Sequence, residues 1–113
     1  MSGDARQAEL VRLRALCGGP RDGALLRMTL AHALLAAGET TAAIAELRRA
    51  LEFDPDYSAA WKLLGKTLAG QGDTAGASAA YRAGIAAAAR HGDVQAEKEM
   101  RVFLRRLEQA GRG

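Results

Sequence analysis

Aromatic and β-branched residues are scarce in this chain. Only 4% of the residues are aromatic although 49% are hydrophobic, so alanine and leucine supply most of the apolar side chains. That balance favours helices packed closely on one another over a sheet core. No segment alternates apolar and polar residues for long enough to indicate a strand. The composition therefore predicts an all-α protein, and a length of 113 residues fits a single domain over 1–113.

Cysteine and long apolar runs are also nearly absent. The single cysteine, Cys17, excludes an internal disulfide and is typical of a protein in a reducing compartment. Because Cys17 ends an apolar helix face, we expect a small buried hydrophobe rather than a nucleophile. No apolar run approaches the roughly 20 residues of a membrane span, and residues 1–6 lack the apolar core of a signal peptide. We expect a cytoplasmic protein with no membrane segment.

Residues that could assemble a catalytic or metal site are sparse. His32 and His91 are far apart, and no spacing of carboxylates and histidines suggests a metal site. The Gly70-x-Gly72 pair lacks the strand and the further glycine of a dinucleotide-binding loop. No nucleophile triad, phosphate loop or paired acid is present. We expect a protein that is not an enzyme, with no catalytic, metal or cofactor-binding residues.

What the chain does contain is an internal repeat. Shifting the sequence by 34 residues pairs seven positions of the same kind. The pairs are Leu30 with Leu64, Ala31 with Gly65, Leu34 with Leu68, Gly38 with Gly72, Ala43 with Ala77, Leu47 with Tyr81 and Ala50 with Gly84. Such agreement at one offset indicates two copies of a helix-turn-helix unit.

The paired positions have distinct structural roles. The leucines recur at helical spacing, and Gly38 and Gly72 follow them where a left-handed residue ends a helix. Thr40 or Thr41, and likewise Asp73, can cap the next helix. A glycine inside a helix costs about 1 kcal/mol relative to alanine, so Gly65 and Gly84 predict close contact between helices.

These residues resemble the tetratricopeptide repeat signature, including its length. The second copy carries the match Trp61-x2-Leu64-Gly65-x2-Leu68 followed by Ala77-x3-Tyr81. The first copy reads Arg27-x2-Leu30-Ala31-x2-Leu34, then Ala43-x3-Leu47 and Pro55. It departs from the signature at Arg27, where a large apolar residue is expected, and the second copy has Ala89 in place of the proline. The whole chain resembles small stand-alone bacterial members of this family, which implies tandem antiparallel helix-turn-helix repeats.

Six helices are expected, at about 4–17, 23–37, 40–53, 55–70, 73–90 and 93–108. Asp54 and Pro55 are predicted to start the fourth helix as its cap and first residue. The resemblance implies repeats at 24–57 and 58–91, an N-terminal capping half-repeat at 1–22 and a C-terminal capping helix at 92–113. Leu10, Leu13 and Leu16 give the first cap its apolar face, which we expect to contact Leu26. Asp93 caps the last helix, whose inner face carries Ala96, Met100, Phe103 and Leu107.

In this family the first helix of each repeat lines a concave groove that holds peptides. Carried over by repeat position, the resemblance implies a non-catalytic protein-interaction module, an adaptor or assembly factor. The implied groove residues are Leu25, Met28, Thr29 and His32, then Ala59, Lys62, Leu63 and Lys66. Leu25, Met28 and Leu63 could form an apolar floor of this groove. Alternatively, the terminal helices could cover these three residues, which would then belong to the core. His32 could titrate near neutral pH, or be a bystander.

Lys62 and Lys66 lie one turn apart and repel each other, which an acidic segment or a terminal carboxylate of a partner would relieve. The alternative is a solvated lysine pair. The chain has no asparagine, so the lysine–asparagine carboxylate clamp of some family members is not supported. The expected partner is a protein or peptide of unknown identity, and no cofactor.

The residues of the last helix suggest two alternative functions. Its basic residues could contact nucleic acid; they are Lys98, Arg101, Arg105 and Arg106, with Arg90 before them. Interspersed acids, missing aromatics and a net charge of only +3 disfavour that role. Val102 and Leu104 lie partly off the inner face and could support a weak homodimer. We expect a monomer or a weak homodimer that does not bind nucleic acid.

Overall fold

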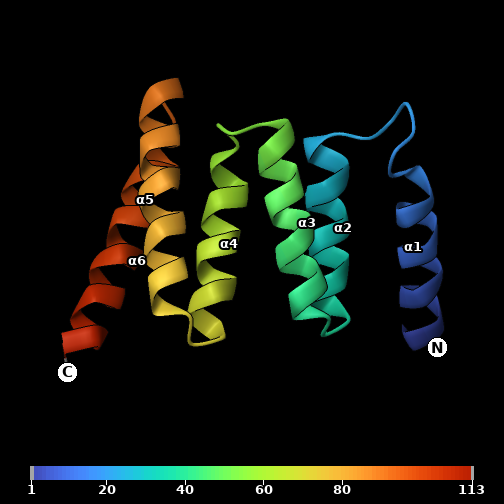
Figure 1. Ribbon diagram of the computed structural model, residues 1–113, viewed down its shortest axis with the longest axis horizontal. Helices are drawn as coiled ribbons and strands as arrows, with labels where there is room; N and C mark the ends of the chain where they lie inside the picture. Colours follow the sequence, from blue (N-terminus) through green and yellow to red (C-terminus); the bar gives the residue numbers. More distant parts are fainter. Residues whose placement is uncertain (1, 113) are drawn as a thin grey trace. The chain divides into compact units, whose positions relative to one another are not determined.

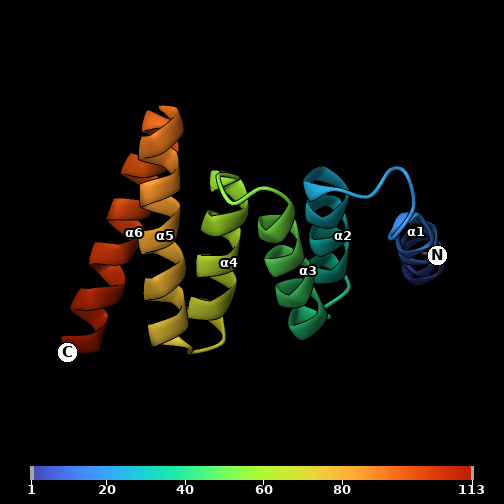
Figure 2. The same ribbon diagram turned by 45° about the horizontal axis from the view of Figure 1, so that its top comes forward.

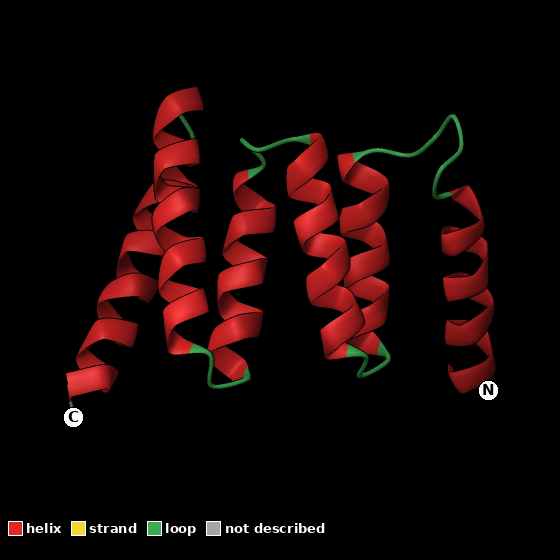
Figure 3. Ribbon diagram, viewed as in Figure 1, coloured by secondary structure: helices red, strands yellow, loops and turns green. Residues whose placement is uncertain are grey.

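The computed structural model describes residues 2–112, and within this range it contains six α-helices and no strand (Figures 1 and 3). The helices are α1 Ser2–Leu16, α2 Ala24–Ala36, α3 Thr40–Phe53, α4 Ser58–Gly70, α5 Thr74–His91 and α6 Val94–Arg112. The predicted all-α repeat fold is confirmed. The largest differences from the predicted bounds are the later start of α4 and the longer α6.

The chain forms two compact units, Met1–Asp54 with α1 to α3 and Pro55–Gly113 with α4 to α6. Each unit has a helix-turn-helix pair together with one terminal helix. The predicted bounds of the single domain, the repeats and the caps stay predictions.

The core of the first unit joins all three of its helices. Leu10 and Leu13 of α1 are buried together with Leu30 and Leu34 of α2 and Ala43 of α3. Leu26 and Cys17 pack against this cluster, as expected from the apolar face of the first helix. Cys17 is half-buried, and this burial raises the pKa of its thiol. A raised pKa disfavours the thiolate and agrees with a packing role.

The two helix pairs turn in the same way. Gly38 and Gly72 have φ angles of +77° and +83°, the left-handed conformation predicted for both. The residue after each glycine donates its backbone N–H back into the preceding helix, from Glu39 to the Leu34 oxygen and from Asp73 to that of Leu68, both at 2.9 Å. These bonds satisfy carbonyls that the helix end would leave unpaired.

The predicted helix caps have mixed outcomes. Asp73 accepts a hydrogen bond from the Gly76 N–H at 2.9 Å and caps α5 as predicted. The threonine cap is wrong, because α3 begins at Thr40 itself and Glu39 precedes it without a side-chain cap. The start of α4 at Pro55 is also wrong. The Pro55 carbonyl lies in a loop and accepts the Trp61 indole N–H at 2.8 Å, and the helix begins only at Ser58.

In the second unit α5 packs against both α4 and α6, as Figures 1 and 2 show. Alanine and glycine allow this close approach, because α5 buries Ala77, Ala80, Tyr81, Gly84, Ile85, Ala87 and Ala88. A Cβ atom built on Gly65 would meet the Tyr81 ring, and one built on Gly84 would lie 2.6 Å from the Trp61 Cβ. The predicted reason for both glycines, close helix contact, is confirmed.

The last helix is amphipathic as predicted. Ala96 and Met100 are buried, while Phe103 and Leu107 are half-buried on the same face. Within the described residues, no helix combines the length and apolarity that crossing a membrane requires.

Candidate functional site

The first candidate surface is the open face of α2. Leu25, Thr29 and His32 are all exposed and lie at the i, i+4 and i+7 positions, so they form one stripe along the helix. Leu25 is a large apolar residue with 72% of its surface exposed. The Thr29 hydroxyl donates to the Leu25 carbonyl of its own helix at 2.9 Å. We call these three residues the α2 stripe.

Met28 lies elsewhere. Only 7% of its surface is exposed, so its side chain is buried and not part of the accessible surface of α2. From the sequence, Met28 could either line the floor of the groove or belong to the core. The structure buries it. Three of the four predicted residues of α2 are thus accessible to a partner.

The second candidate surface is the predicted face of α4. Ala59 and Lys66 are exposed, while Lys62 and Leu63 are half-buried. The Lys62 ammonium lies 3.4 Å from a Glu99 carboxylate oxygen of α6. The Lys66 ammonium lies 5.5 Å from the centre of the Phe103 ring, also on α6. The last helix therefore offsets much of the lysine repulsion that suggested an acidic ligand.

A hydrogen bond also ties the starts of α4 and α6 together. Asp93 accepts from the Ser58 hydroxyl at 2.7 Å and from the Ala96 N–H at 3.1 Å, so it caps α6 as predicted and holds a buried serine. The Ser58 hydroxyl, followed by the Ala96 N–H, lowers the pKa of the Asp93 carboxyl. Sequence reasoning found the cap and missed the serine.

Arg27 forms a charge cluster that sequence reasoning also missed. Its Nε and one terminal nitrogen donate to the two oxygens of Asp22, each at 2.8 Å, and the other terminal nitrogen donates to Glu46 at 2.8 Å. All three side chains are largely buried. The departure of Arg27 from the repeat signature was visible in the sequence, but its partners lie on the preceding loop and on α3. The cluster joins parts of the first unit and leaves the α2 stripe open.

The basic residues of the second unit are partly paired. Arg101 contacts Glu97 at 2.9 Å, and Arg90 contacts Asp56 at 2.6 Å. Lys98, Arg105 and Arg106 are exposed and have no ion pair with a described residue. Val102 is 37% exposed and Leu104 is half-buried, so neither forms a broad apolar patch.

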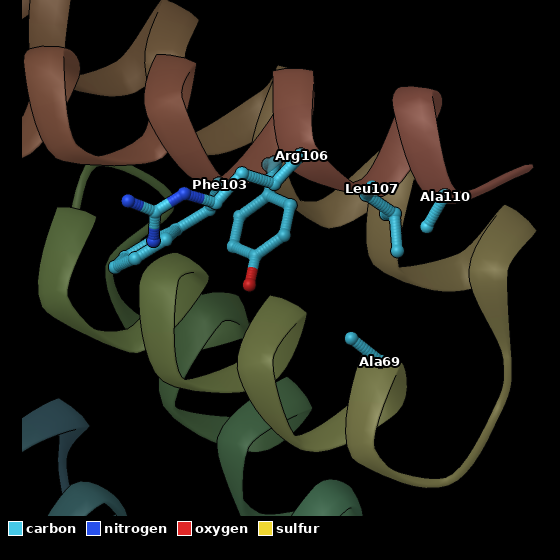
Figure 4. A pocket seen from close by; sticks show the side chains of 6 residues that line it. Ala69, Phe103, Arg106, Leu107 and Ala110 are labelled. Carbon is cyan, nitrogen blue, oxygen red and sulfur yellow. The ribbon is translucent and has the colours of Figure 1, made fainter.

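No group of three or more histidine, cysteine or carboxylate side chains in the described part of the chain could hold a metal ion. One small pocket does occur in the second unit, and sequence reasoning missed it. It has a volume of about 270 Å³ and opens between α4, α5 and the second half of α6 (Figure 4). Its lining residues are Ala69, Tyr81, Phe103, Arg106, Leu107 and Ala110. None of them is among the eight predicted groove residues.

Comparison with known proteins supports the repeat assignment. A tetratricopeptide repeat profile matches residues 23–67. A TPR repeat-containing protein of Pseudomonas aeruginosa is 55% identical over 89 residues, which cover 79% of this chain and 85% of that protein.

Solved structures of other proteins share the fold of this chain. A protein from Bordetella parapertussis, solved in solution, is 50% identical with a TM-score of 0.75 over 89% of this chain and 88% of its own. PcrH, crystallised with the chaperone binding region of PopD, has a TM-score of 0.84 at 14% identity, over 97% of this chain and 84% of its own. At that identity PcrH shows a likeness of fold alone. Together with the signature around Trp61 and Tyr81, the Pseudomonas relative shows that this chain belongs to the tetratricopeptide repeat family.

Proposed function

We propose that this chain is a non-catalytic protein-interaction module that binds a short segment of a partner protein. The observation that carries the proposal is the α2 stripe: Leu25, Thr29 and His32 are exposed along the repeat's first helix, and 72% of the surface of Leu25 is accessible. In such a stripe the apolar side chain offers contact area to a partner, and the polar neighbours offer hydrogen-bonding groups. The corresponding residues of α4 are the second proposed contact.

The fold agrees with this role. PcrH, which shares it, was crystallised with the chaperone binding region of PopD. The charges of α4 favour an acidic partner, although Glu99 and Phe103 already engage the two lysines, so we expect the apolar contact at Leu25 to contribute more than Lys62 and Lys66. With one half-buried cysteine and no pairing partner for it, we also propose a reducing, cytoplasmic location.

The test compares two exposed apolar residues, one inside the predicted binding surface and one outside it. The purified chain, carrying an affinity tag, captures partners from the cell of origin, and the Leu25→Ser variant is expected to lose most of the captured partner. The matched control is Val11→Ser on α1, which removes a side chain that is 67% exposed outside the predicted surface. Equal capture by wild type and Leu25→Ser, with unchanged helicity, would move the binding surface elsewhere.

A double variant tests α4 separately. Lys62→Ala with Lys66→Ala is expected to weaken capture. The control Arg48→Ala with Lys98→Ala removes the same number of positive charges outside the predicted surface and should leave capture unchanged. If both double variants capture less by the same amount, net charge rather than the α4 face is responsible.

A further inference from the structure

The pocket of the second unit has mostly apolar walls. Ala69, Phe103, Leu107 and Ala110 contribute hydrocarbon surface from two helices (Figure 4). Its volume of about 270 Å³ falls just below the range of about 300–1,000 Å³ typical of small-molecule sites. The pocket therefore suits a single side chain better than a cofactor.

Tyr81 adds a polar group without a partner. Only 3% of the residue is exposed, and its hydroxyl forms no hydrogen bond with any described residue. No fully enclosed polar side-chain atom of the described residues lacks a partner, so this hydroxyl keeps some accessible surface, and Tyr81 is one of the residues that line the pocket. Burial raises the pKa of Tyr81, which keeps the phenol protonated and able to donate.

The rim of the pocket is cationic. Arg106 lines it and has no ion pair with a described carboxylate. The Lys66 ammonium lies 5.5 Å from the centre of the Phe103 ring, which forms one wall. Glu108, two residues after Arg106, is engaged by Arg82 at 3.2 Å. Tyr81 and Arg106 thus contribute two hydrogen-bond donors to an otherwise apolar lining.

We propose that this pocket binds an apolar side chain of an acidic partner segment, with Tyr81 and Arg106 donating hydrogen bonds to a carboxylate next to that side chain. A leucine-sized anchor fills the apolar volume, and the neighbouring carboxylate supplies the acceptor that Tyr81 lacks and the charge that Arg106 lacks. The site lies outside the eight predicted groove residues and stands whether or not the α2 stripe binds.

The test is a titration of the full isotope-labelled chain, followed by amide NMR, with the blocked tripeptide Glu-Leu-Glu. We expect saturable shifts at Ala69, Phe103, Leu107 and Ala110, with an affinity in the millimolar range for so small a ligand. Glu-Ala-Glu removes the anchor and Lys-Leu-Lys reverses the charge. Each control peptide should bind at least about tenfold more weakly.

Two variants separate binding from structure. Tyr81→Phe and Arg106→Gln should each weaken Glu-Leu-Glu binding about three- to tenfold, whereas Lys98→Gln, which removes an unpaired cation on the same helix, leaves it unchanged. Tyr81→Phe should not lower the melting temperature, because the hydroxyl has no hydrogen-bond partner among the residues that the structure describes. If the Tyr81 hydroxyl had only a structural role, Tyr81→Phe would lower the melting temperature and leave Glu-Leu-Glu binding unchanged.

Three results would overturn the proposal. One is the absence of saturable shifts at the pocket residues. Another is equal affinity of wild type, Tyr81→Phe and Arg106→Gln. The third is a shift of the same amides with protein concentration alone, which would make a second copy of the chain the occupant.

Discussion

Arg27 stands where the second repeat carries Trp61, and it fills that position with charge instead of an aromatic ring. Its guanidinium makes a two-pronged contact with Asp22 and a single one with Glu46. Such a cluster stabilises the fold only while every member is present, because a buried charge without its partner is costly. The first unit therefore depends on three residues at a position where an apolar side chain suffices in the second.

Replacing the arginine should expose that dependence. Arg27→Met leaves two largely buried carboxylates unpaired and should lower the free energy of unfolding by about 2–4 kcal/mol. Urea denaturation measures this loss of unfolding free energy. The triple variant with Asp22→Asn and Glu46→Gln should recover most of the loss, since the unpaired charges are then gone. Unchanged stability of Arg27→Met would show that the cluster contributes nothing.

The same cluster makes stability depend on pH. The Arg27 guanidinium, followed by the Gly18 backbone N–H, holds the pKa of the Asp22 carboxyl well below its usual range. A carboxyl whose pKa is lower in the folded state stabilises the fold above its unfolded pKa of about 3.9, and this contribution is lost as the pH falls toward the folded value. Between about pH 5 and pH 2, wild type should lose more stability than Asp22→Asn. Parallel melting curves of the two proteins over this range would contradict the assignment.

At the scale of the helices, Asp73 and Asp93 cap the N-termini of α5 and α6, but they accept different hydrogen bonds. Asp73 satisfies one backbone N–H, whereas Asp93 satisfies a backbone N–H and the hydroxyl of Ser58, which is 5% exposed. Asp73→Ala should cost about 1 kcal/mol, as for an ordinary cap. Asp93→Ala should cost about 1 kcal/mol more, because it also leaves the serine unpaired.

Thermal denaturation checks the difference between the two caps. Adding Ser58→Ala to Asp93→Ala should remove the extra cost, because no buried hydroxyl is then left without a partner. Equal costs for Asp73→Ala and Asp93→Ala would mean that the serine contact adds no stability.

Close packing of α5 against its neighbours predicts opposite effects for two glycines. Gly84→Ala places a methyl group against Trp61 and Met100, and the Trp61 Cβ is too near the backbone to move away. We expect a loss of about 1–3 kcal/mol despite the better helix propensity of alanine. Gly70→Ala, at the end of α4 with open space around it, should be neutral or stabilising by up to about 1 kcal/mol. Chemical denaturation of both variants measures the contrast; a destabilised Gly70→Ala with a neutral Gly84→Ala would contradict the packing.

These elements also show how far sequence reasoning reaches. The roles of Gly38, Gly65 and Gly84 could be predicted because a glycine just after a helix or inside one has few physical explanations. The start of α4 could not, since an aspartate–proline pair can begin a helix or occupy a turn. The indole of Trp61 decides between them by binding the Pro55 carbonyl, and that contact depends on the finished fold.

The candidate site was predictable to a similar extent. Repeat position located the exposed stripe of α2, but it could not show that Met28 turns inward. Lys62 and Glu99 are 37 residues apart, so their contact depends on how α6 packs. The unpaired hydroxyl of Tyr81 is a property of three helices together, and no sequence pattern marks it.

For the whole molecule, charge and exposure favour a protein partner over nucleic acid. The basic residues of the second unit are interrupted by Glu97, Asp56 and Glu108, which pair with three of its arginines. Nucleic-acid binding through phosphates depends on a continuous set of unpaired cations. Leu25 of α2 is 72% exposed and lies at a position that the repeat predicts to face a partner.

The central claim is that the exposed α2 stripe binds a partner protein, and site-specific photocrosslinking in the cell of origin tests it most directly. A photoreactive phenylalanine at Thr29 should give a discrete crosslinked species, while the same group at Ala45, an exposed residue of α3, should not. Mass spectrometry of the species identifies the partner, and a product of twice the chain's mass would indicate self-association instead. No crosslink at Thr29, or the same crosslinks at both positions, would contradict the account.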